Sequence, residues 1–261
     1  GVNYIRVRIW NEPHDDNGNT YGGGHSDLET AAKIGKRAAQ FGMKLLADIQ
    51  YSDFWADPSK QTRPKYWQQH DHNTLKGEIY KWTSWVLQYL TENGSDIGMV
   101  QVGNETECFF CGETDMYKIC DLFSSGEKAV RDFDRNILIA HHFANAGNGH
   151  FGWYAQVMNE CRLDYDIFAC SYYSYWHGSL DNLRNTLTDI GNKLYMERYM
   201  KKPIETEYQR IVREHDNATH GYIIKDVAQI LTDTGRYRSV SMSRKGNLIK
   251  LPDGKVCIPD I

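Results

Sequence analysis

Hydrophobic and polar positions along the chain follow two alternating periods, and these predict strands and helices in turn. Residues 4–10 alternate apolar with basic side chains at a period of two, which is typical of a strand. A helix is expected to begin after an N-cap at Asp27 and to run to about Phe41. The nearly continuous apolar run over 43–49 then predicts a strand that is covered on both faces.

The same alternation continues as far as about residue 207. Apolar positions that recur every three or four residues from Leu75 to Leu90, Trp82 included, predict one buried stripe on a helix that ends at Asn93-Gly94. Further strands are expected at 97–104, 137–140, 165–171 and 204–207, and further helices at 116–130, 151–161 and 180–194. Six strand–helix units therefore follow one another without a break in composition.

Repeated strand–helix units predict an α/β fold, for which two architectures compete. Each unit is about 30–45 residues long, a spacing that suits either a (β/α)8 barrel or a doubly wound parallel sheet. A doubly wound nucleotide-binding sheet would carry a glycine-rich phosphate-binding turn after its first strand. Gly22-Gly23-Gly24 lies there but matches neither phosphate-binding pattern, so the barrel is favoured.

The residues beyond about 220 follow a different pattern from the rest of the chain. Residues 223–231 have helical periodicity, and residues 248–256 predict a hairpin around a Pro-Asp-Gly turn. We therefore expect one barrel domain over residues 1–220, followed by a divergent segment over 221–261.

Composition and charge exclude several classes of protein. Of the 261 residues, 30 are basic and 34 are acidic, so the formal net charge of −4 lacks the basic excess with which proteins track a phosphate backbone. No apolar run approaches the ~20 residues that a membrane span requires. We therefore expect neither a nucleic acid nor a membrane as partner. Aromatic residues make up 13% of the chain, and such flat rings stack on sugars as well as filling cores.

The six cysteines include one closely spaced pair, Cys108 and Cys111. That spacing occurs in redox and zinc half-sites, but no second Cys or His pair at zinc spacing accompanies it. We therefore expect loop thiols or one local disulfide here, and we assign no metal site.

Two glutamates stand at the ends of predicted strands, where the reactive groups of a barrel project. Glu105 follows Asn104 at the end of the strand over 97–104, and Glu205 lies in the strand over 204–207. In a barrel these strands would face each other across the mouth, and two facing carboxyls suit glycoside hydrolysis. A separation of ~5–5.5 Å between the carboxyls gives retention of configuration, and ~6.5–9.5 Å gives inversion.

Polar side chains near these carboxyls add to the predicted site. Asn104 has an amide group of the kind that hydrogen-bonds a sugar hydroxyl and strengthens that bond in the transition state. Arg8 points inward from the first strand, where it either holds the opposite carboxylate ionised or forms a salt bridge at the edge of the core.

Four segments resemble the endo-β-1,4-galactanases of glycoside hydrolase family 53, in that family's order and spacing. They are 3–11 (NYIRVRIWN), 51–58 (YSDFWADP), 98–106 (GMVQVGNET) and 171–178 (SYYSYWHG). The likeness covers about residues 1–220 and implies a (β/α)8 TIM barrel of the large clan of retaining glycosidases. It also implies hydrolysis of internal β-1,4-galactosidic bonds in type I arabinogalactan, the galactan side chains of pectin.

The resemblance implies roles for individual residues. Glu105 matches the family's acid/base, and Glu205 matches its nucleophile, with Glu207 as the alternative if the register is shifted by two residues. The other matched positions are implied to bind substrate. Those around the nucleophile are Arg8, Asn104 and Tyr173. Those along the galactan cleft are Asp53, Trp55, Tyr175, Trp176 and His177. This chemistry requires no cofactor.

The sequence departs from the family pattern in several places. Gln50 stands where the family usually carries a His, and the family's first strand would precede Gly1. The last Trp of the chain is Trp176, so the Trp of the family's eighth strand is absent. We therefore expect an apparently truncated barrel of strands two to seven, with low stability and weak activity. Asp216 and His220 loosely match a calcium-binding loop but fall short of the six to eight oxygens that calcium requires, so no structural calcium is assigned.

Two functional classes remain open at this point. The chain is either an enzyme or a catalytically impaired galactan-binding barrel, as Gln50 and the missing Trp would suggest. As an enzyme it is a retaining endo-β-1,4-galactanase or another retaining β-glycanase of the same clan. In each case the partner is a polysaccharide, and we expect a monomer that is secreted from a bacterium.

Overall fold

The computed structural model describes residues 2–21, 25–107 and 109–199, together with three two-residue strands at 241–242, 249–250 and 256–257. The chain divides into two compact units. The first comprises residues 1–146 and 160–177, and the second comprises 147–159 and 178–261. All of the candidate site residues before residue 178 belong to the first unit.

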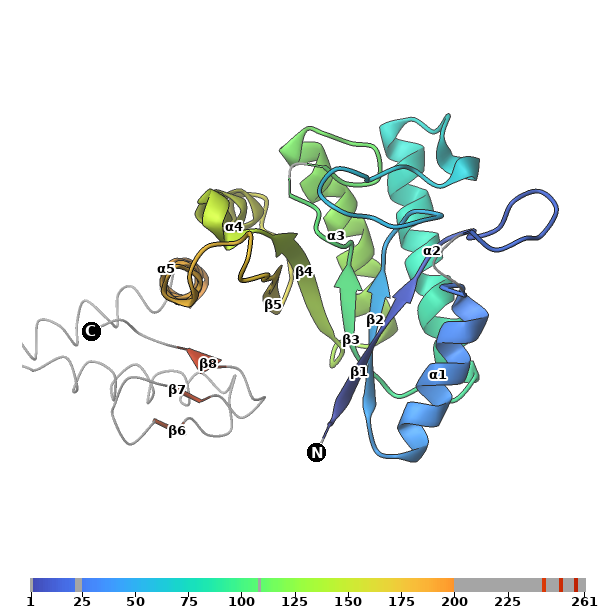
Figure 1. The fold of residues 1–261 in the computed structure, drawn as a ribbon, viewed down its shortest axis with the longest axis horizontal. Coiled ribbons are helices and arrows are strands. Elements are labelled where there is room, and N and C mark those ends of the chain that lie inside the picture. Colours follow the sequence, from blue (N-terminus) through green and yellow to red (C-terminus); the bar gives the residue numbers. More distant parts are fainter. Residues whose placement is uncertain are drawn as a thin grey trace, which may run out of the picture. The chain divides into compact units, whose positions relative to one another are not determined.

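A five-stranded parallel sheet forms the centre of the first unit (Figure 1). Its strands lie side by side in chain order, as in a barrel, whereas a doubly wound sheet reverses its strand order part-way. They are β1 (Tyr4–Ile9), β2 (Lys44–Ile49), β3 (Ile97–Val102), β4 (Leu138–Ala144) and β5 (Ile167–Ser171). The register pairs Arg8 with Asp48 and Asp48 with Gln101, so polar residues become neighbours across three strands.

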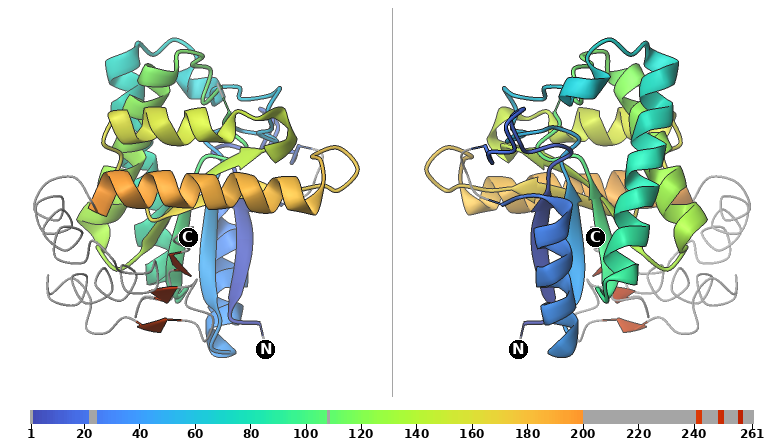
Figure 2. Two further views of the ribbon diagram at one scale, coloured as in Figure 1. Left: turned by 90° about the vertical axis from the view of Figure 1, so that its left-hand side faces the viewer. Right: turned by 90° about the vertical axis from the view of Figure 1, so that its right-hand side faces the viewer.

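Three helices of the first unit connect these strands, and each begins at an aspartate. They are α1 (Leu28–Gln40), α2 (His72–Glu92) and α3 (Met116–Phe133). The carboxylates of Asp27, Asp71 and Asp115 accept hydrogen bonds from backbone N–H groups of the first turn, which satisfies donors that the helix cannot. Helix α1 packs on β1 and β2, and α2 packs on α3 (Figure 2).

The buried stripe of α2 differs from the predicted one, because Thr83 takes the place of Trp82 and Leu87 is buried as well. Leu75, Ile79 and Leu90 are fully buried as expected, but Trp82 is only half-buried and Thr83 takes the interior position. Thr83 is tolerated there because its hydroxyl lies 2.7 Å from the carbonyl oxygen of Ile79 and 2.8 Å from the hydroxyl of Tyr51. The hydrophobic pattern of the helix favoured Trp82, because it contains no information about Tyr51, which follows β2 and supplies the polar partner of Thr83.

The described residues of the second unit form two α-helices and a small antiparallel sheet. Its elements are α4 (Phe151–Glu160), α5 (Leu180–Tyr199), β6 (Ser241–Met242), β7 (Ile249–Lys250) and β8 (Val256–Cys257). Strands β7 and β8 are antiparallel, with Ile249 opposite Cys257, which confirms the hairpin predicted over 248–256.

Every element that the sequence predicts within residues 2–199 is present at nearly the predicted place. The strand predicted at 204–207, the helix at 223–231 and the boundary at residue 220 lie outside the described residues. No helix in the described part of the chain has both the length and the apolar character that a membrane crossing demands.

Candidate active site

Strands β1, β2 and β3 carry a polar layer made of Arg6, Asp48 and Gln101, in which Asp48 and Gln101 are buried and the Arg6 side chain is partly exposed. The guanidinium of Arg6 lies 2.9 Å from a carboxylate oxygen of Asp48, which is fully buried. Gln101 accepts a 3.0 Å hydrogen bond from Nε of Arg6 and donates a 2.8 Å bond to Asp48. Burial raises the pKa of Asp48 to about 6, against the opposing effect of the Arg6 charge.

This layer holds Asn104, which follows β3. The side-chain oxygen of Asn104 accepts a 2.8 Å hydrogen bond from Arg6 and a 3.2 Å bond from Gln101, and it lies 2.8 Å from Nδ1 of His142 on β4. Its amide nitrogen donates one hydrogen to the carbonyl of Ala56 at 2.8 Å. The second hydrogen of that NH2 group remains to bind a hydroxyl of a ligand.

Glu105 is presented by a sharp turn at the end of β3. Gly103 has a φ of +82° and Glu105 a φ of +48°, so two left-handed residues flank Asn104. A Cβ on Gly103 would lie 2.6 Å from Thr106 and 2.9 Å from Phe110, so the turn requires glycine. The unfavourable φ of Glu105 is maintained by bonds around it: its carbonyl accepts from Gln61, and the next amide donates to the carbonyl of His142.

His142 is a buried member of this network that the sequence did not single out. Its Nδ1 also lies 3.3 Å from the backbone nitrogen of Glu105, and its Nε2 lies 3.1 Å from the hydroxyl of Ser171 on β5. Burial, reinforced by the charge of Arg6, lowers the pKa of His142 to about 3. The imidazole is therefore neutral near pH 7 and acts as a fixed hydrogen-bonding link between β3, β4 and β5.

Glu107 is a second acidic side chain in the same loop; the residue is half-buried and its carboxyl group is turned inward. One of its carboxyl oxygens accepts a hydrogen bond from the backbone nitrogen of Ala144, and the other is buried without a partner among the described residues. Burial raises the pKa of Glu107 to about 8, and the neighbouring charge of Glu105 acts in the same direction. Glu107 is therefore protonated at neutral pH in the folded protein.

Replacing Glu107 with Gln should remove a pH dependence of stability. The unfolded chain releases this proton near pH 4.3, whereas the folded chain retains it up to about 8. Between these values the folded state binds more protons, so the wild type loses stability as pH rises, by an amount on the order of 3–5 kcal/mol. The variant mimics the neutral carboxyl and should gain stability relative to wild type between pH 5 and pH 8.5, measured as melting temperature.

Glu29→Gln is the matched control for this experiment. Glu29 is an exposed residue of α1 that pairs with Lys33, and its replacement should leave a small difference from wild type that does not grow with pH. A Glu107→Gln difference that is equally flat would show that Glu107 is ionised in the folded state.

Asp53 and Gln50 brace the loops around the site. The carboxylate of Asp53 accepts hydrogen bonds from the backbone nitrogens of Glu12 at 2.9 Å and Lys65 at 2.7 Å, and burial raises its pKa. Gln50 is buried and bonds the indole of Trp10 at 2.9 Å as well as Asp48. The residue in place of the family His therefore has a complete set of structural partners.

Trp55 lies at the exposed rim of the site, with Arg8 against one face. The guanidinium carbon of Arg8 is 3.9 Å from the ring centre of Trp55, a cation–π contact. The edge of Trp55 packs on the buried Trp10 at 5.6 Å between ring centres. About a third of Trp55 remains exposed, which leaves ring surface for a ligand.

The loop after β5 presents three exposed aromatic side chains, Tyr173, Tyr175 and Trp176. His177 differs from them because it is buried, with its Nδ1 3.1 Å from the carbonyl oxygen of Ser171 and 3.2 Å from the nitrogen of Tyr173. His177 therefore braces the loop that carries the exposed rings.

The structure places Asn104, Glu105, Arg8 and Trp55 at the carboxyl-terminal edge of the sheet, and their roles stay predictions. The predicted residues Glu205, Glu207, Asp216 and His220 lie outside the described residues. Within the described part of the chain, no cluster of three or more His, Cys, Asp or Glu side chains is arranged to hold a metal ion.

Three residues of the site were missed by sequence reasoning. Arg6 carried a usable signal, because it lies two positions before Arg8 and therefore on the same face of β1. His142 was missed because the predicted strand over 137–140 ended too early. Glu107 carried no signal, because its burial depends on contacts made by β4.

A family model described as glycosyl hydrolase family 53 matches residues 1–241. The chain belongs to glycosyl hydrolase family 53. Among its relatives, an endo-β-1,4-galactanase of Bacillus subtilis (strain 168) is 48% identical over 222 residues, which are 85% of this chain and 51% of that protein. An arabinogalactan endo-β-1,4-galactanase of Cellvibrio japonicus is 32% identical over 235 residues, 84% of this chain and 59% of that protein.

The family 53 chain also matches solved structures. The catalytic domain of the Ignisphaera aggregans family 53 protein aligns with a TM-score of 0.70 and 29% identity, over 90% of this chain and 71% of that one. A structure of fungal β-1,4-galactanases aligns with a TM-score of 0.64 and 24% identity, over 89% of this chain and 74% of the fungal chain. It shows the same fold. The fold class is therefore the (β/α)8 TIM barrel, and this chain spans about half the length of its Bacillus relative.

Proposed function

We propose that this family 53 chain belongs to a retaining endo-β-1,4-galactanase that hydrolyses internal β-1,4-galactosidic bonds of type I arabinogalactan. The observation that carries the proposal is the turn after β3, which fixes Asn104 through Arg6 and His142 and presents Glu105 at the sheet edge. Family membership and the names of the similar proteins, endo-β-1,4-galactanase among them, support the same substrate.

In this proposal two carboxyl groups have different catalytic roles, one as acid/base and one as nucleophile. Glu105 protonates the glycosidic oxygen while Glu205 attacks the anomeric carbon, and the aglycone leaves as a glycosyl–enzyme bond forms. Glu105 then removes a proton from the water that releases the sugar, so two inversions give net retention. The free hydrogen on the amide of Asn104 donates to the sugar hydroxyl next to the reacting carbon.

Rigidity of the polar layer is what this chemistry needs from the fold. The side-chain oxygen of Asn104 is already occupied by Arg6 and Gln101, so only the NH2 group is directed to a ligand. A donor fixed before substrate arrives requires no reorganisation in the transition state.

The exposed aromatic residues supply binding surface for a chain of sugars. Trp55, Tyr175 and Trp176 present rings at the same edge of the sheet as Glu105, and the apolar faces of galactose stack on such rings. Because Arg8 covers one face of Trp55, a sugar would stack on the other.

Hydrolysis of β-1,4-galactan tests the proposal directly. We expect reducing ends to appear while the viscosity of the polymer falls early, as internal cleavage requires, and the first product seen by NMR to be the β-anomer. Release of a single sugar size from chain ends, or an initial α-anomer, would contradict it. Retention of the chain in a galactan gel without any sugar release would identify a galactan-binding barrel instead.

Trp55→Ala should weaken substrate binding more than catalysis. Loss of one stacking ring is expected to raise KM for galactan about tenfold and to change kcat little, because the ring does not contact the reacting bond. Trp85→Ala is the control, since Trp85 is a half-exposed tryptophan on α2 that takes no part in the proposed site. A fall in kcat at unchanged KM would place Trp55 outside the sugar-binding surface.

We further propose that the protein is a secreted monomer of bacterial origin and that galactan is its partner. The relatives named as galactanases support the substrate, and the substrate is a polymer of the plant cell wall, too large to enter a cell intact. Size-exclusion chromatography with light scattering tests the monomer.

A further inference from the structure

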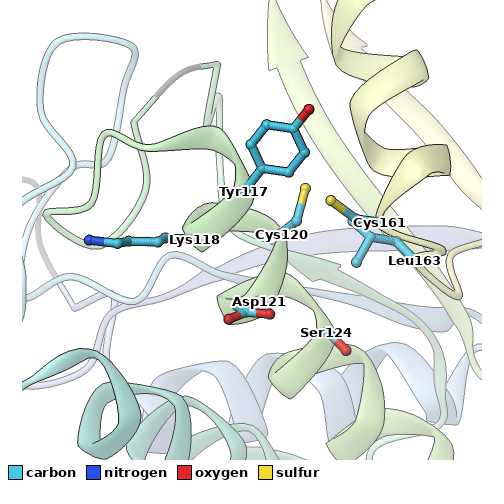
Figure 3. A pocket seen from close by; sticks show the side chains of 7 residues that line it. All are labelled: Tyr117, Lys118, Cys120, Asp121, Ser124, Cys161 and Leu163. Atoms are coloured by element: carbon cyan, nitrogen blue, oxygen red, sulfur yellow. The ribbon is translucent and has the colours of Figure 1, made fainter.

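Two cysteines from distant parts of the chain meet at the surface of the first unit. Cys120 lies on α3, and Cys161 lies in the turn between α4 and β5. Their thiols are in hydrogen-bonding contact and are directed toward the same cavity, of about 330 Å³ (Figure 3). The other residues that line this cavity are Tyr117, Lys118, Asp121, Ser124 and Leu163.

One face of α3 is tied to the segment 160–166 on both sides of the cysteines. The hydroxyl of Tyr117 donates to Glu160 at 3.3 Å, one helical turn before Cys120. Further along the same face, Glu127 accepts a 2.9 Å hydrogen bond from the backbone nitrogen of Asp164, and Arg131 lies 3.0 Å from the carboxylate of Asp164.

These ties fix the relative position of the two thiols. Residues 117, 120, 127 and 131 recur at helical spacing, so they form a single stripe along α3. Their partners follow the same order along the chain: Glu160 bonds Tyr117 and Asp164 bonds Glu127, and Cys161 lies between Glu160 and Asp164. The two thiols are therefore held in contact with each other, which is the arrangement from which a disulfide can form.

We propose that Cys120 and Cys161 form a disulfide bond, by exchange with a low-molecular-weight disulfide, that staples α3 to the turn before β5. In the structure Cys111, Cys120, Cys161 and Cys170 are all free thiols, so the proposed bond is one that forms on oxidation. The sequence pointed instead to Cys108 and Cys111, but Cys108 lies outside the described residues. The pair at 120 and 161 is about 40 residues apart, and only the fold brings it together.

The exchange has two steps. The half-exposed thiolate of Cys161 attacks the small disulfide, which forms a mixed disulfide and releases one small thiolate. The thiolate of Cys120 then attacks the sulfur of Cys161 and releases the second small thiol. In total the protein loses two protons and two electrons, which reduce the small disulfide to two thiols.

Burial of Cys120 affects the rate of this reaction. Burial raises the pKa of the Cys120 thiol, and the adjacent Cys161 acts in the same direction. The second step should therefore accelerate as pH rises. Once formed, the bond persists in the oxidising surroundings of a secreted protein, and its formation does not depend on galactan hydrolysis.

Peptide mapping of the full chain tests the proposal. The protein is incubated with oxidised glutathione, free thiols are blocked with iodoacetamide, and the digest is analysed by mass spectrometry. We expect one cross-linked species that joins the peptides of Cys120 and Cys161 and lacks the mass of two hydrogen atoms. Reduction with dithiothreitol should abolish this species and lower the melting temperature by roughly 5–10 °C.

Two variants separate this bond from other thiol effects. Cys161→Ser should lose the cross-linked species and the response of the melting temperature to dithiothreitol. Cys170→Ser, which alters a half-buried cysteine of β5, should keep both. The proposal is overturned if Cys120 and Cys161 are both alkylated after treatment, or if either is joined to a different cysteine. Mapping of the wild type decides this even if Cys161→Ser fails to fold.

Discussion

Glu105→Gln is expected to lower kcat on β-1,4-galactan by about 10³-fold, with little change in KM. Gln has nearly the same shape as Glu and keeps the bond that the backbone carbonyl of residue 105 accepts from Gln61. It has no proton to give to the leaving oxygen, and general acid catalysis contributes typically 10²–10⁴-fold. The measurement is reducing-sugar release at saturating galactan, compared with wild type at equal concentration of folded protein.

A substrate with a good leaving group distinguishes lost acid catalysis from lost structure. An aryl galacto-oligosaccharide that releases nitrophenolate needs no proton on its leaving oxygen, so Glu105→Gln should form the glycosyl–enzyme at close to the wild-type rate. Azide should then accelerate turnover, because it attacks without a general base. If Glu105→Gln remained within about tenfold of wild type on galactan, Glu105 would not be the acid/base.

Arg6→Met is expected to lower the free energy of unfolding by roughly 1–3 kcal/mol at pH 8, because it removes the guanidinium that lies against the buried carboxylate of Asp48 and is itself partly exposed. Without the Arg6 charge the pKa of Asp48 should rise further above about 6. The folded variant then holds a proton that the unfolded chain has released, so its stability falls as pH increases. The loss relative to wild type should therefore be smaller at pH 5 than at pH 8, measured by urea denaturation.

Two further variants test the cause of this loss. Arg6→Met combined with Asp48→Asn removes both charges and should recover much of the lost stability, because no buried charge remains. Arg8→Met should cost less than about 1 kcal/mol, since Arg8 stacks on the ring of Trp55 and its charge acts on Asp48 more weakly than the charge of Arg6. Equal losses for Arg6→Met and Arg8→Met at both pH values would contradict the role assigned to Asp48.

Gln50 illustrates how a departure from a family pattern is interpreted differently once packing is known. From the sequence, Gln in place of His suggested an impaired site. In the structure Gln50 is buried, bonds Trp10 and Asp48, and accepts a 3.1 Å hydrogen bond from the backbone nitrogen of Ala56. It thereby holds the loop that carries Trp55, which is a structural role for Gln50 that the sequence did not indicate.

Local patterns were sufficient for the elements of the described residues. The N-cap at Asp27 was identified correctly because helix ends depend on a few adjacent residues, and the hairpin over 248–256 because turn chemistry is local. The burial of Thr83 in place of Trp82 was not predicted, because it depends on the hydroxyl of Tyr51, a residue in the loop between β2 and α2. The same limit applies to the site, where strand ends located Asn104 and Glu105 but not their supports.

By itself, the sequence determined the order of strands and helices, the family, and the two positions after β3 where chemistry is expected, because each depends on neighbours in the chain. Only the tertiary structure decided that Arg6 and His142 hold Asn104, that the carboxyl group of Glu107 is turned inward and protonated, and that Cys120 meets Cys161. These properties depend on desolvation and on contacts between segments tens of residues apart, which arise only when the sheet assembles.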